Sequence, residues 1–316
     1  MIQIDEAKAR ELLEWAPLIE TIENLFREGC EVPVRHHHTI EVPGDPDATL
    51  LLMPAWQIGK YLGIKILTIF PGNANRNMAA LDAQVILFNG ETGQILATVD
   101  GGELTARRTG AASALASRYL SKADASTLLM VGTGRLSTNL IPAHAVARPI
   151  KKVIVWGRSL EKAEQVAAGA AALGLDASAT EDAATAAGEA DIVSCATLSP
   201  DALVMGDWLN PGVHVDLVGA YTPEMRESDD QVMARADRII VDTIDGAMAE
   251  AGDVLQPLND GVITKDDIKG DLFDLTRGTA DGRQSDDEIT VFKSVGTSIE
   301  DLAGAILAYE TATGAG

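Results

Sequence analysis

Apolar residues near the start of the chain recur at the three- and four-residue spacing of one helix face. Trp15, Leu18, Ile22 and Phe26 follow this spacing within residues 5–28, a pattern typical of one or two amphipathic helices. We expect these helices to open a first domain.

Short β-rich runs replace the helical pattern between Val34 and Val99. Pro-Gly, Asn-Gly and Thr-Gly pairs separate the runs, which favours antiparallel strands joined by turns. An Ala-rich stretch from Leu104 to Leu120 then predicts a helix. The predicted strands are 49–53, 64–70, 84–88 and 95–99.

Apolar strand-like runs alternate with helical segments in the following part of the chain, and a last helix is predicted at 298–311. Such alternation indicates a parallel sheet with crossover helices. We therefore predict an α/β protein with a doubly wound Rossmann unit at about 126–241. Its predicted strands are 127–131, 152–156, 192–196, 213–218 and 238–241, with helices at 141–147 and 160–173.

The first of these strands leads directly into the sequence GTGRLS. Gly132 permits a tight turn, Gly134 allows the backbone to approach a pyrophosphate, and the small Ser137 takes the close-packing position. The following helix offers free N–H groups to phosphates. A plain turn is the alternative, but the position between a strand and a helix favours a dinucleotide. The candidate residues are Gly132, Thr133, Gly134, Arg135, Leu136 and Ser137.

The end of the second strand bears on which dinucleotide binds. NAD-binding proteins place an acid there, about 20 residues after the glycines, to bind the ribose 2′-OH. This chain has Trp156, Gly157, Arg158 and Ser159 instead, and Arg158 with Ser159 suits a 2′-phosphate. We predict NADPH, with NADH and a solvent-facing Arg158 as the alternative.

Two further strand ends carry small residues. Ala196 and Thr197 end one predicted strand, and Val218 and Gly219 end the next. Because ligands bind at the carboxyl edge of such a sheet, we expect these residues to contact the nicotinamide.

Composition narrows the range of partners and of compartments. A net charge of −22 argues against nucleic acid and anionic membrane surfaces. The two cysteines, Cys30 and Cys195, suggest neither a disulfide framework nor a metal-binding pair. We see no signal pattern and no apolar run of about 18 residues, so we expect a cytoplasmic protein.

Three cations occupy unusual settings in the first half of the chain. Arg35 follows Pro33-Val34, Lys65 lies within an apolar strand, and Arg108 lies within the Ala-rich helix. A lysine in an apolar strand is seldom buried without a partner. A bound anion is one such partner, and a solvated or internally salt-bridged cation is the alternative.

The triplet His36, His37 and His38 invites a metal interpretation. Consecutive strand residues point to alternating faces, so the three rings do not converge easily on one ion. We expect no metal site, and a place for His37 or His38 beside the substrate stays open.

Several segments together resemble the ornithine cyclodeaminase and mu-crystallin family over nearly the whole chain. The resemblance implies a dimerisation domain at 1–118 plus 298–316, an inserted Rossmann domain at 119–297, and a homodimer that closes a β-barrel. It also implies that Arg35, Lys65 and Arg108 hold a substrate carboxylate, with Lys65 and Arg108 as catalytic residues, and that Gly296 contacts the cofactor. The segments are 33–35, 52–56, Lys65, 100–101, 104–113, the loop at Gly132, 211–220 and 292–296.

One position departs from the cyclodeaminases of that family. They carry an aspartate just after Val-Gly-Gly, where this chain has Tyr221 after Ala220. A phenol with a pKa near 10 is a poor base at neutral pH. The resemblance therefore points to the imine-reducing members, with Tyr221 as a residue that lines the substrate site or simply packs.

We accordingly expect NAD(P)H-dependent reduction of a small cyclic imino acid, Δ1-pyrroline-2-carboxylate or Δ1-piperideine-2-carboxylate, to L-proline or L-pipecolate. The alternatives are an alanine-type amino-acid dehydrogenase or an N-alkyl amino-acid-forming imine reductase. Ornithine cyclodeamination and non-catalytic, crystallin-like binding follow behind these.

Overall fold

The computed structural model describes residues 1–315, which fall into two compact units. The first contains Met1–Arg108 and the chain from Thr297 onward, and the second contains Thr109–Gly296. The sequence suggests boundaries at 118/119 and 297/298, and the structure places them at 108/109 and 296/297. Both 108/109 and 118/119 lie inside the continuous helix α3 (Gly101–Leu120), where the hydrophobic pattern marks no boundary.

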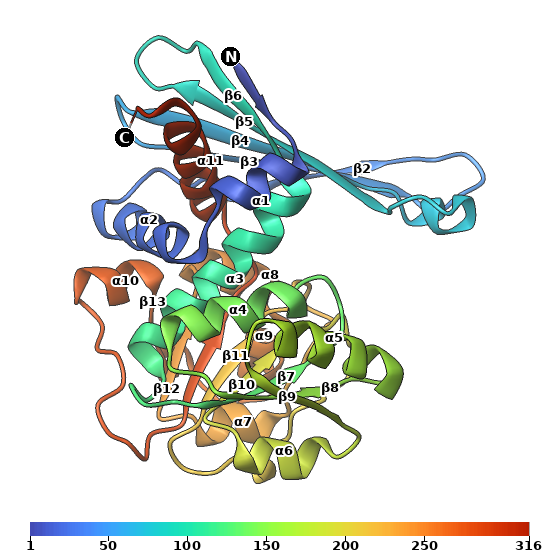
Figure 1. Cartoon of the computed structure of the whole chain (residues 1–316), viewed down its shortest axis with the longest axis vertical. Helices are drawn as coiled ribbons and strands as arrows, with labels where there is room; N and C mark the ends of the chain where they lie inside the picture. The colour runs from blue at the N-terminus through green and yellow to red at the C-terminus, as the bar shows by residue number, and fades with distance from the viewer. Residues whose placement is uncertain (316) are drawn as a thin grey trace. The chain divides into compact units, whose positions relative to one another are not determined.

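A six-stranded sheet forms the body of the first unit (Figure 1). Its order is β1-β6-β5-β4-β3-β2, antiparallel throughout except that β1 runs parallel to β6. The four predicted strands are present, and the structure adds β1 and β2. The strands are β1 (Ile2–Ile4), β2 (His36–Ile40), β3 (Ala48–Trp56), β4 (Tyr61–Ile69), β5 (Leu81–Asn89) and β6 (Ile95–Asp100). The helices are α1 (Glu6–Leu12), α2 (Trp15–Glu28) and α11 (Ser298–Thr313).

Helix α11 packs against β4 and α2. Gly63, Lys65 and Leu67 alternate with less buried residues along β4 and share its buried face. A Cβ atom at Gly63 would lie 3.0 Å from Cδ1 of Leu302 on α11. The missing side chain therefore lets the helix lie close to the strand two residues before Lys65.

The second unit is built on an eight-stranded, entirely parallel sheet. Its order is β13-β12-β14-β11-β10-β7-β8-β9, so β8 and β9 lie on one side of β7 and the later strands, from β10 onward, lie on the other, as in doubly wound dinucleotide-binding folds. The predicted α/β class is confirmed. The strands are β7 (Thr127–Val131), β8 (Lys152–Trp156), β9 (Asp176–Thr180), β10 (Ile192–Cys195), β11 (His214–Leu217), β12 (Arg238–Val241), β13 (Ile268–Asp271) and β14 (Thr290–Lys293). The helices that follow α3 are α4 (Ser137–Ala147), α5 (Leu160–Ala172), α6 (Ala183–Glu189), α7 (Asp230–Arg235), α8 (Ile244–Glu250), α9 (Gly252–Asn259) and α10 (Leu272–Arg277).

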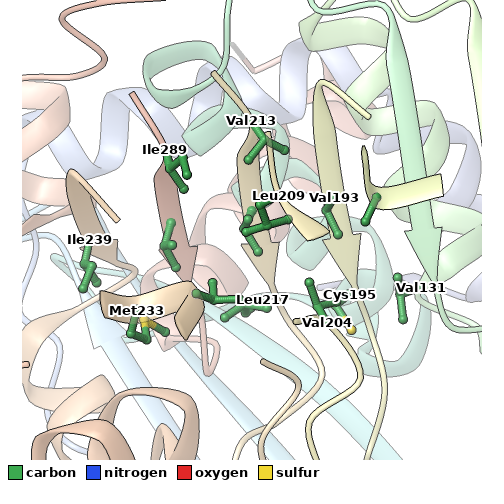
Figure 2. Close-up of a cluster of buried hydrophobic side chains, with 14 of the residues drawn as sticks. Val131, Val193, Cys195, Val204, Leu209, Val213, Leu217, Met233, Ile239 and Ile289 are labelled. Atoms are coloured by element: carbon green, nitrogen blue, oxygen red, sulfur yellow. The ribbon is translucent and has the colours of Figure 1, made fainter. Parts of the chain in front are cut away.

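Both faces of this parallel sheet are buried. Leu129 and Val131 of β7 join one apolar cluster, part of which is drawn in Figure 2, and Leu128 and Met130 join another on the opposite face. Burial on both faces explains why β7 is a continuous apolar run rather than an alternating one. Among the described residues, no helix combines the length and apolarity that crossing a membrane requires.

Candidate functional site

The loop after β7 has the geometry that a pyrophosphate requires. Gly132 has a φ of 121°, and a Cβ atom there would lie 2.6 Å from the carbonyl oxygen of Ala196, so only glycine fits. At Gly134 a Cβ atom would meet nothing within 4 Å. Helix α4 begins at Ser137 with no side-chain cap, and the N–H groups of Ser137 and Asn139 donate to the carbonyls of Gly134 and Leu136. The loop therefore fits a dinucleotide.

The loop after β8 packs beside the first. A Cβ atom at Gly157 would lie 2.6 Å from the γ-methyl of Thr133, so the two loops are in close contact. Ser159 caps α5, and Trp156 donates its ring N–H to the Glu181 carbonyl, 3.2 Å away. Arg158 is exposed. No acid occupies positions 157–159, so no carboxylate in this segment opposes a 2′-phosphate.

Three predicted cofactor contacts use their polar groups internally. Thr197 donates both its backbone N–H and its hydroxyl to the Glu227 carboxylate, at 2.6 and 2.9 Å. Gly219 donates its N–H to the same carboxylate at 2.7 Å. Gly296 donates to Asp242 at 2.7 Å. Ala196 and Val218 likewise donate their N–H groups to strand carbonyls. All five residues can therefore pack against a ligand, but their N–H groups already have acceptors within the protein.

Lys293 is fully buried at the end of β14, beside two carboxylates. Its Nζ lies 3.1 Å from Asp253 and 3.9 Å from Glu227. Burial raises the pKa of Glu227 to about 7, with Lys293 opposing this shift and Asp253 adding to it. Burial also raises the pKa of the neighbouring Cys195 thiol well above its usual value. We did not predict Glu227, Asp242 or Asp253 from sequence, because their acidic surroundings read as surface loops.

A second buried charge cluster lies in the first unit and contains two of the predicted substrate cations. Lys65 Nζ lies 3.0 and 2.8 Å from the two carboxylate oxygens of Asp301 and 3.4 Å from the Thr105 hydroxyl. The Nε of Arg108 donates to Asp301 at 3.0 Å, and its Nη1 pairs with Glu300. The acids come from the first turn of α11.

The internal pairing favours the ionised forms of this cluster. Burial lowers the pKa of Lys65 to about 8, although Asp301 opposes the shift. Burial also acts against charge on Arg108, but Asp301 and Glu300 outweigh it and raise the arginine's pKa. Arg108 and Lys65 in turn hold the pKa of Asp301 below its usual value against the effect of burial. The internally salt-bridged state that the sequence left open is therefore present for Lys65 and Arg108.

Arg35 lies near this cluster, at the start of β2. It is half-buried, and its charge contributes to lowering the pKa values of Lys65 and His37. The structure thus places Arg35 within electrostatic range of Lys65, while Lys65 and Arg108 share Asp301.

The histidine triplet lies exposed on β2. The rings of His36 and His38 meet edge to face, with centroids 6.4 Å apart, while the intervening His37 alternates to the other face. Within residues 1–315, no group of three or more histidine, cysteine or acidic residues is arranged to hold a metal ion.

Tyr221 lies just beyond the loop that Glu227 holds. It directly follows Ala220, whose N–H is 3.3 Å from the Glu227 carboxylate, and it is 38% exposed. Tyr221 thus lies in the segment after β11 (His214–Leu217), which begins with the predicted nicotinamide contacts Val218 and Gly219.

Known proteins resemble this chain over its full length. It is 36% identical over 291 residues to Delta(1)-pyrroline-2-carboxylate reductase of Paracoccus denitrificans (strain Pd 1222), covering 92% of this chain and 90% of the relative. Thermococcus litoralis Delta(1)-pyrroline-2-carboxylate reductase, solved with NADH and L-proline, superposes with a TM-score of 0.92 at 30% identity, covering 100% of this chain and 98% of the other.

An archaeal alanine dehydrogenase dimer with bound NAD is also similar, with a TM-score of 0.90 at 27% identity over 99% of this chain and 96% of the other. The family model described as "Ornithine cyclodeaminase/mu-crystallin family" matches residues 4–316. This agrees with the resemblance of the sequence motifs, and the chain belongs to the ornithine cyclodeaminase/mu-crystallin family.

Proposed function

We propose that this protein is an NAD(P)H-dependent imine reductase that converts Δ1-pyrroline-2-carboxylate, Δ1-piperideine-2-carboxylate or both to L-proline and L-pipecolate. The observation that carries the proposal is Tyr221 in the segment that follows β11, where a cyclodeaminase has an aspartate, in a chain that keeps an open loop at Gly134. The reductase names of the relatives and the NADH and L-proline in the Thermococcus protein support it.

The cation cluster suits a substrate with a single carboxylate. Lys65 and Arg108 are balanced by Asp301 and Glu300, and Arg35 adds one further positive charge nearby. In the proposed mechanism the substrate carboxylate binds to Arg35 and to the remaining N–H groups of Lys65 and Arg108. Lys65 and Arg108 are then substrate-binding and catalytic residues, while Asp301 and Glu300 hold them in place.

The protein's share of the chemistry is chiefly orientation. A protonated imine is already electrophilic, so hydride transfer depends mainly on geometry. When bound, the dinucleotide supplies the hydride. Lys65 keeps its proton on Nζ at neutral pH because its lowered pKa of about 8 still exceeds 7, so it remains a cation that attracts the substrate carboxylate.

We propose NADPH as the preferred cofactor, with NADH as the alternative. The similar structures contain NADH or NAD, which supports a nicotinamide dinucleotide in general. The exposed Arg158 and the hydroxyl of Ser159, with no acid at positions 157–159, favour the additional 2′-phosphate of NADPH.

We also propose a cytoplasmic homodimer. Strand β2 is an edge of the six-stranded sheet, and an edge strand offers unpaired backbone groups to another chain. The similar archaeal alanine dehydrogenase is a dimer. Light scattering after size-exclusion chromatography should give twice the chain mass of 33.3 kDa, and a monomer at micromolar concentration would contradict the dimer.

An absorbance assay at 340 nm tests the function. The protein is supplied with NADPH or NADH and, in separate reactions, with Δ1-pyrroline-2-carboxylate, Δ1-piperideine-2-carboxylate, pyruvate with ammonia, and pyruvate with methylamine. We expect rapid oxidation with a cyclic imine. Oxidation only with pyruvate and an amine would overturn the proposal and favour the alanine-type alternative, which the structural similarity to alanine dehydrogenase supports. Ornithine with NAD tests cyclodeamination.

A further inference from the structure

The buried carboxylate of Glu227 connects the ends of two parallel strands. Its Oε1 accepts the backbone N–H and the hydroxyl of Thr197, which follows β10. Its Oε2 accepts the N–H groups of Gly219 and Ala220, which follow β11, at 2.7 and 3.3 Å. One side chain therefore holds both loops that we expect to line the nicotinamide.

The third loop, which follows β7, packs against the loop that contains Ala196 and Thr197. A Cβ atom at Gly132 would lie 2.6 Å from the Ala196 carbonyl oxygen and 3.3 Å from the Thr197 γ-methyl. A Cβ atom at Gly219 would lie 2.0 Å from the Thr197 carbonyl oxygen. The backbones of all three loops are thus in direct contact, and a movement of Thr197 would shift both the pyrophosphate loop and the chain that leads to Tyr221.

Buried groups behind Glu227 hold it in place. Its backbone N–H donates to Asp253 at 2.7 Å, and the other oxygen of Asp253 lies 3.1 Å from Lys293 Nζ. Both Glu227 and Lys293 are 0% exposed. A charged network buried at the cofactor edge of the sheet is costly to bury, so a role in positioning accounts for its presence better than stability does.

We propose that Glu227 is a positioning residue for hydride transfer, whose carboxylate sets the arrangement of the β7, β10 and β11 loops against the nicotinamide. The inference rests on the proposed function, because it requires a dinucleotide at these loops. Glu227 acts through Thr197 and Gly219 and touches no reacting atom itself.

The variant Glu227→Gln tests this with little change in volume. Each carboxylate oxygen accepts a hydrogen bond from a backbone N–H group, which can donate but cannot accept. A glutamine in either orientation therefore turns its NH2 group toward one of the two loops and loses contacts there. We expect a kcat about 100-fold lower, as for a small misplacement of reacting groups, with a less affected thermal midpoint.

The kinetic isotope effect separates positioning from a loss of folded protein. With NADPH deuterated at the transferred hydrogen, slower hydride transfer in Glu227→Gln should raise the isotope effect on kcat. Partial unfolding would lower the rate and leave the isotope effect unchanged. The matched control is Glu189→Gln, which alters an exposed carboxylate of the same unit and should retain the wild-type isotope effect and kcat.

The outcomes separate this inference from the proposed function. Wild-type protein that neither quenches NADPH fluorescence nor oxidises it with any imine would overturn the proposed function. A wild type that does both, with an unchanged kcat and isotope effect in Glu227→Gln, would overturn the inference alone.

A second pair of variants serves if Glu227→Gln does not fold. Thr197→Ser keeps the hydroxyl that donates to Glu227, and Thr197→Val removes it at similar volume. We expect the valine variant to raise the isotope effect more than the serine variant does. Equal isotope effects in the two variants and the wild type would contradict the positioning role.

Discussion

At the scale of single residues, the chemistry depends on what each charged group already contacts. The sequence singled out Lys65 and Arg108 because cations are rare in apolar or Ala-rich surroundings, and both are buried. Their partners Asp301 and Glu300 lie about 200 residues later in the chain, in the first turn of α11, a helix that is buried from Ser298 to Ile306. No local pattern could pair them, because the pairing exists only once α11 packs on β4.

Arg158 is predicted to select between the two dinucleotides. It is exposed at the loop after β8, and a bidentate arginine contact to phosphate is strong and depends on charge. Arg158→Ala should raise the KM for NADPH about tenfold or more and leave the KM for NADH nearly unchanged, as measured at 340 nm. Lys162→Ala, an exposed cation on the following helix, is the control. Equal losses for the two dinucleotides would contradict a 2′-phosphate contact.

His214 is predicted to make stability fall in mild acid. Burial lowers its pKa from 6.5 to about 3, so between these values the unfolded chain binds a proton that the native protein does not. Stability should then be fully present above pH 6.5 and decline as the pH falls, by about 1.4 kcal/mol per pH unit from this group.

His214→Gln removes the titration and keeps an N–H donor for Thr290, which lies 3.0 Å from His214 Nδ1. Urea unfolding at pH 7 and pH 5 should show a smaller loss in the variant than in the wild type, by about 2 kcal/mol. A pH dependence identical in both proteins would show that His214 is not the group responsible.

At the scale of elements, close packing decides which side chains meet. The repeated apolar spacing in 5–28 and the alternating runs after residue 120 correctly indicated helices and parallel strands. Strands β9, β13 and β14 escaped prediction. β9 has the sequence DASAT and β13 the sequence IKGD, which lack apolar runs. β14 inserts between β11 and β12 in space although it follows both in sequence, so only the sheet order reveals that Lys293 lies centrally.

Gly63 is predicted to control the contact between β4 and α11. A valine there would clash with Leu302 and displace the helix that carries Asp301 beside Lys65. Gly63→Val should lower the thermal midpoint and raise the KM for the imine, while the dissociation constant for NADPH stays unchanged because the dinucleotide loops belong to the other unit. Gln84→Val, on the exposed face of neighbouring β5, is the control. An unchanged KM for the imine in Gly63→Val would show that the position of α11 does not affect substrate binding.

At the scale of the whole molecule, the two units carry different parts of the proposed reaction. The dinucleotide loops lie within Thr109–Gly296, and the cation cluster lies within Met1–Arg108 and the chain after Thr297. The chain crosses from one unit to the other inside α3 and again just before α11. The proposed substrate cations therefore come from the N-terminal part of the chain and their acidic partners from α11 near its end, on either side of the second unit.

This division predicts separate ligand protection. NADPH alone should slow hydrogen exchange in peptides that cover 132–137 and 156–159, and NADPH at 100 times its dissociation constant should stabilise the unit that binds it by about 2.7 kcal/mol. L-Proline, as a product, should slow exchange in peptides around Lys65 and Arg108. Exchange measured by mass spectrometry in the two singly liganded states provides the test. NADPH protection confined to the Lys65 peptides would contradict the assignment of the dinucleotide to the second unit.

The sequence by itself determined the α/β class, the glycine-rich loop between β7 and α4, and the family, because these depend on local spacing: glycines between a strand and a helix, and apolar residues at helix or strand periods. Tertiary structure alone decided that Lys65 and Arg108 are paired with α11 and that Glu227 joins the ends of β10 and β11. Burial makes such polar groups seek whatever partner the packed chain brings within about 3 Å, and that partner has no fixed place in the sequence.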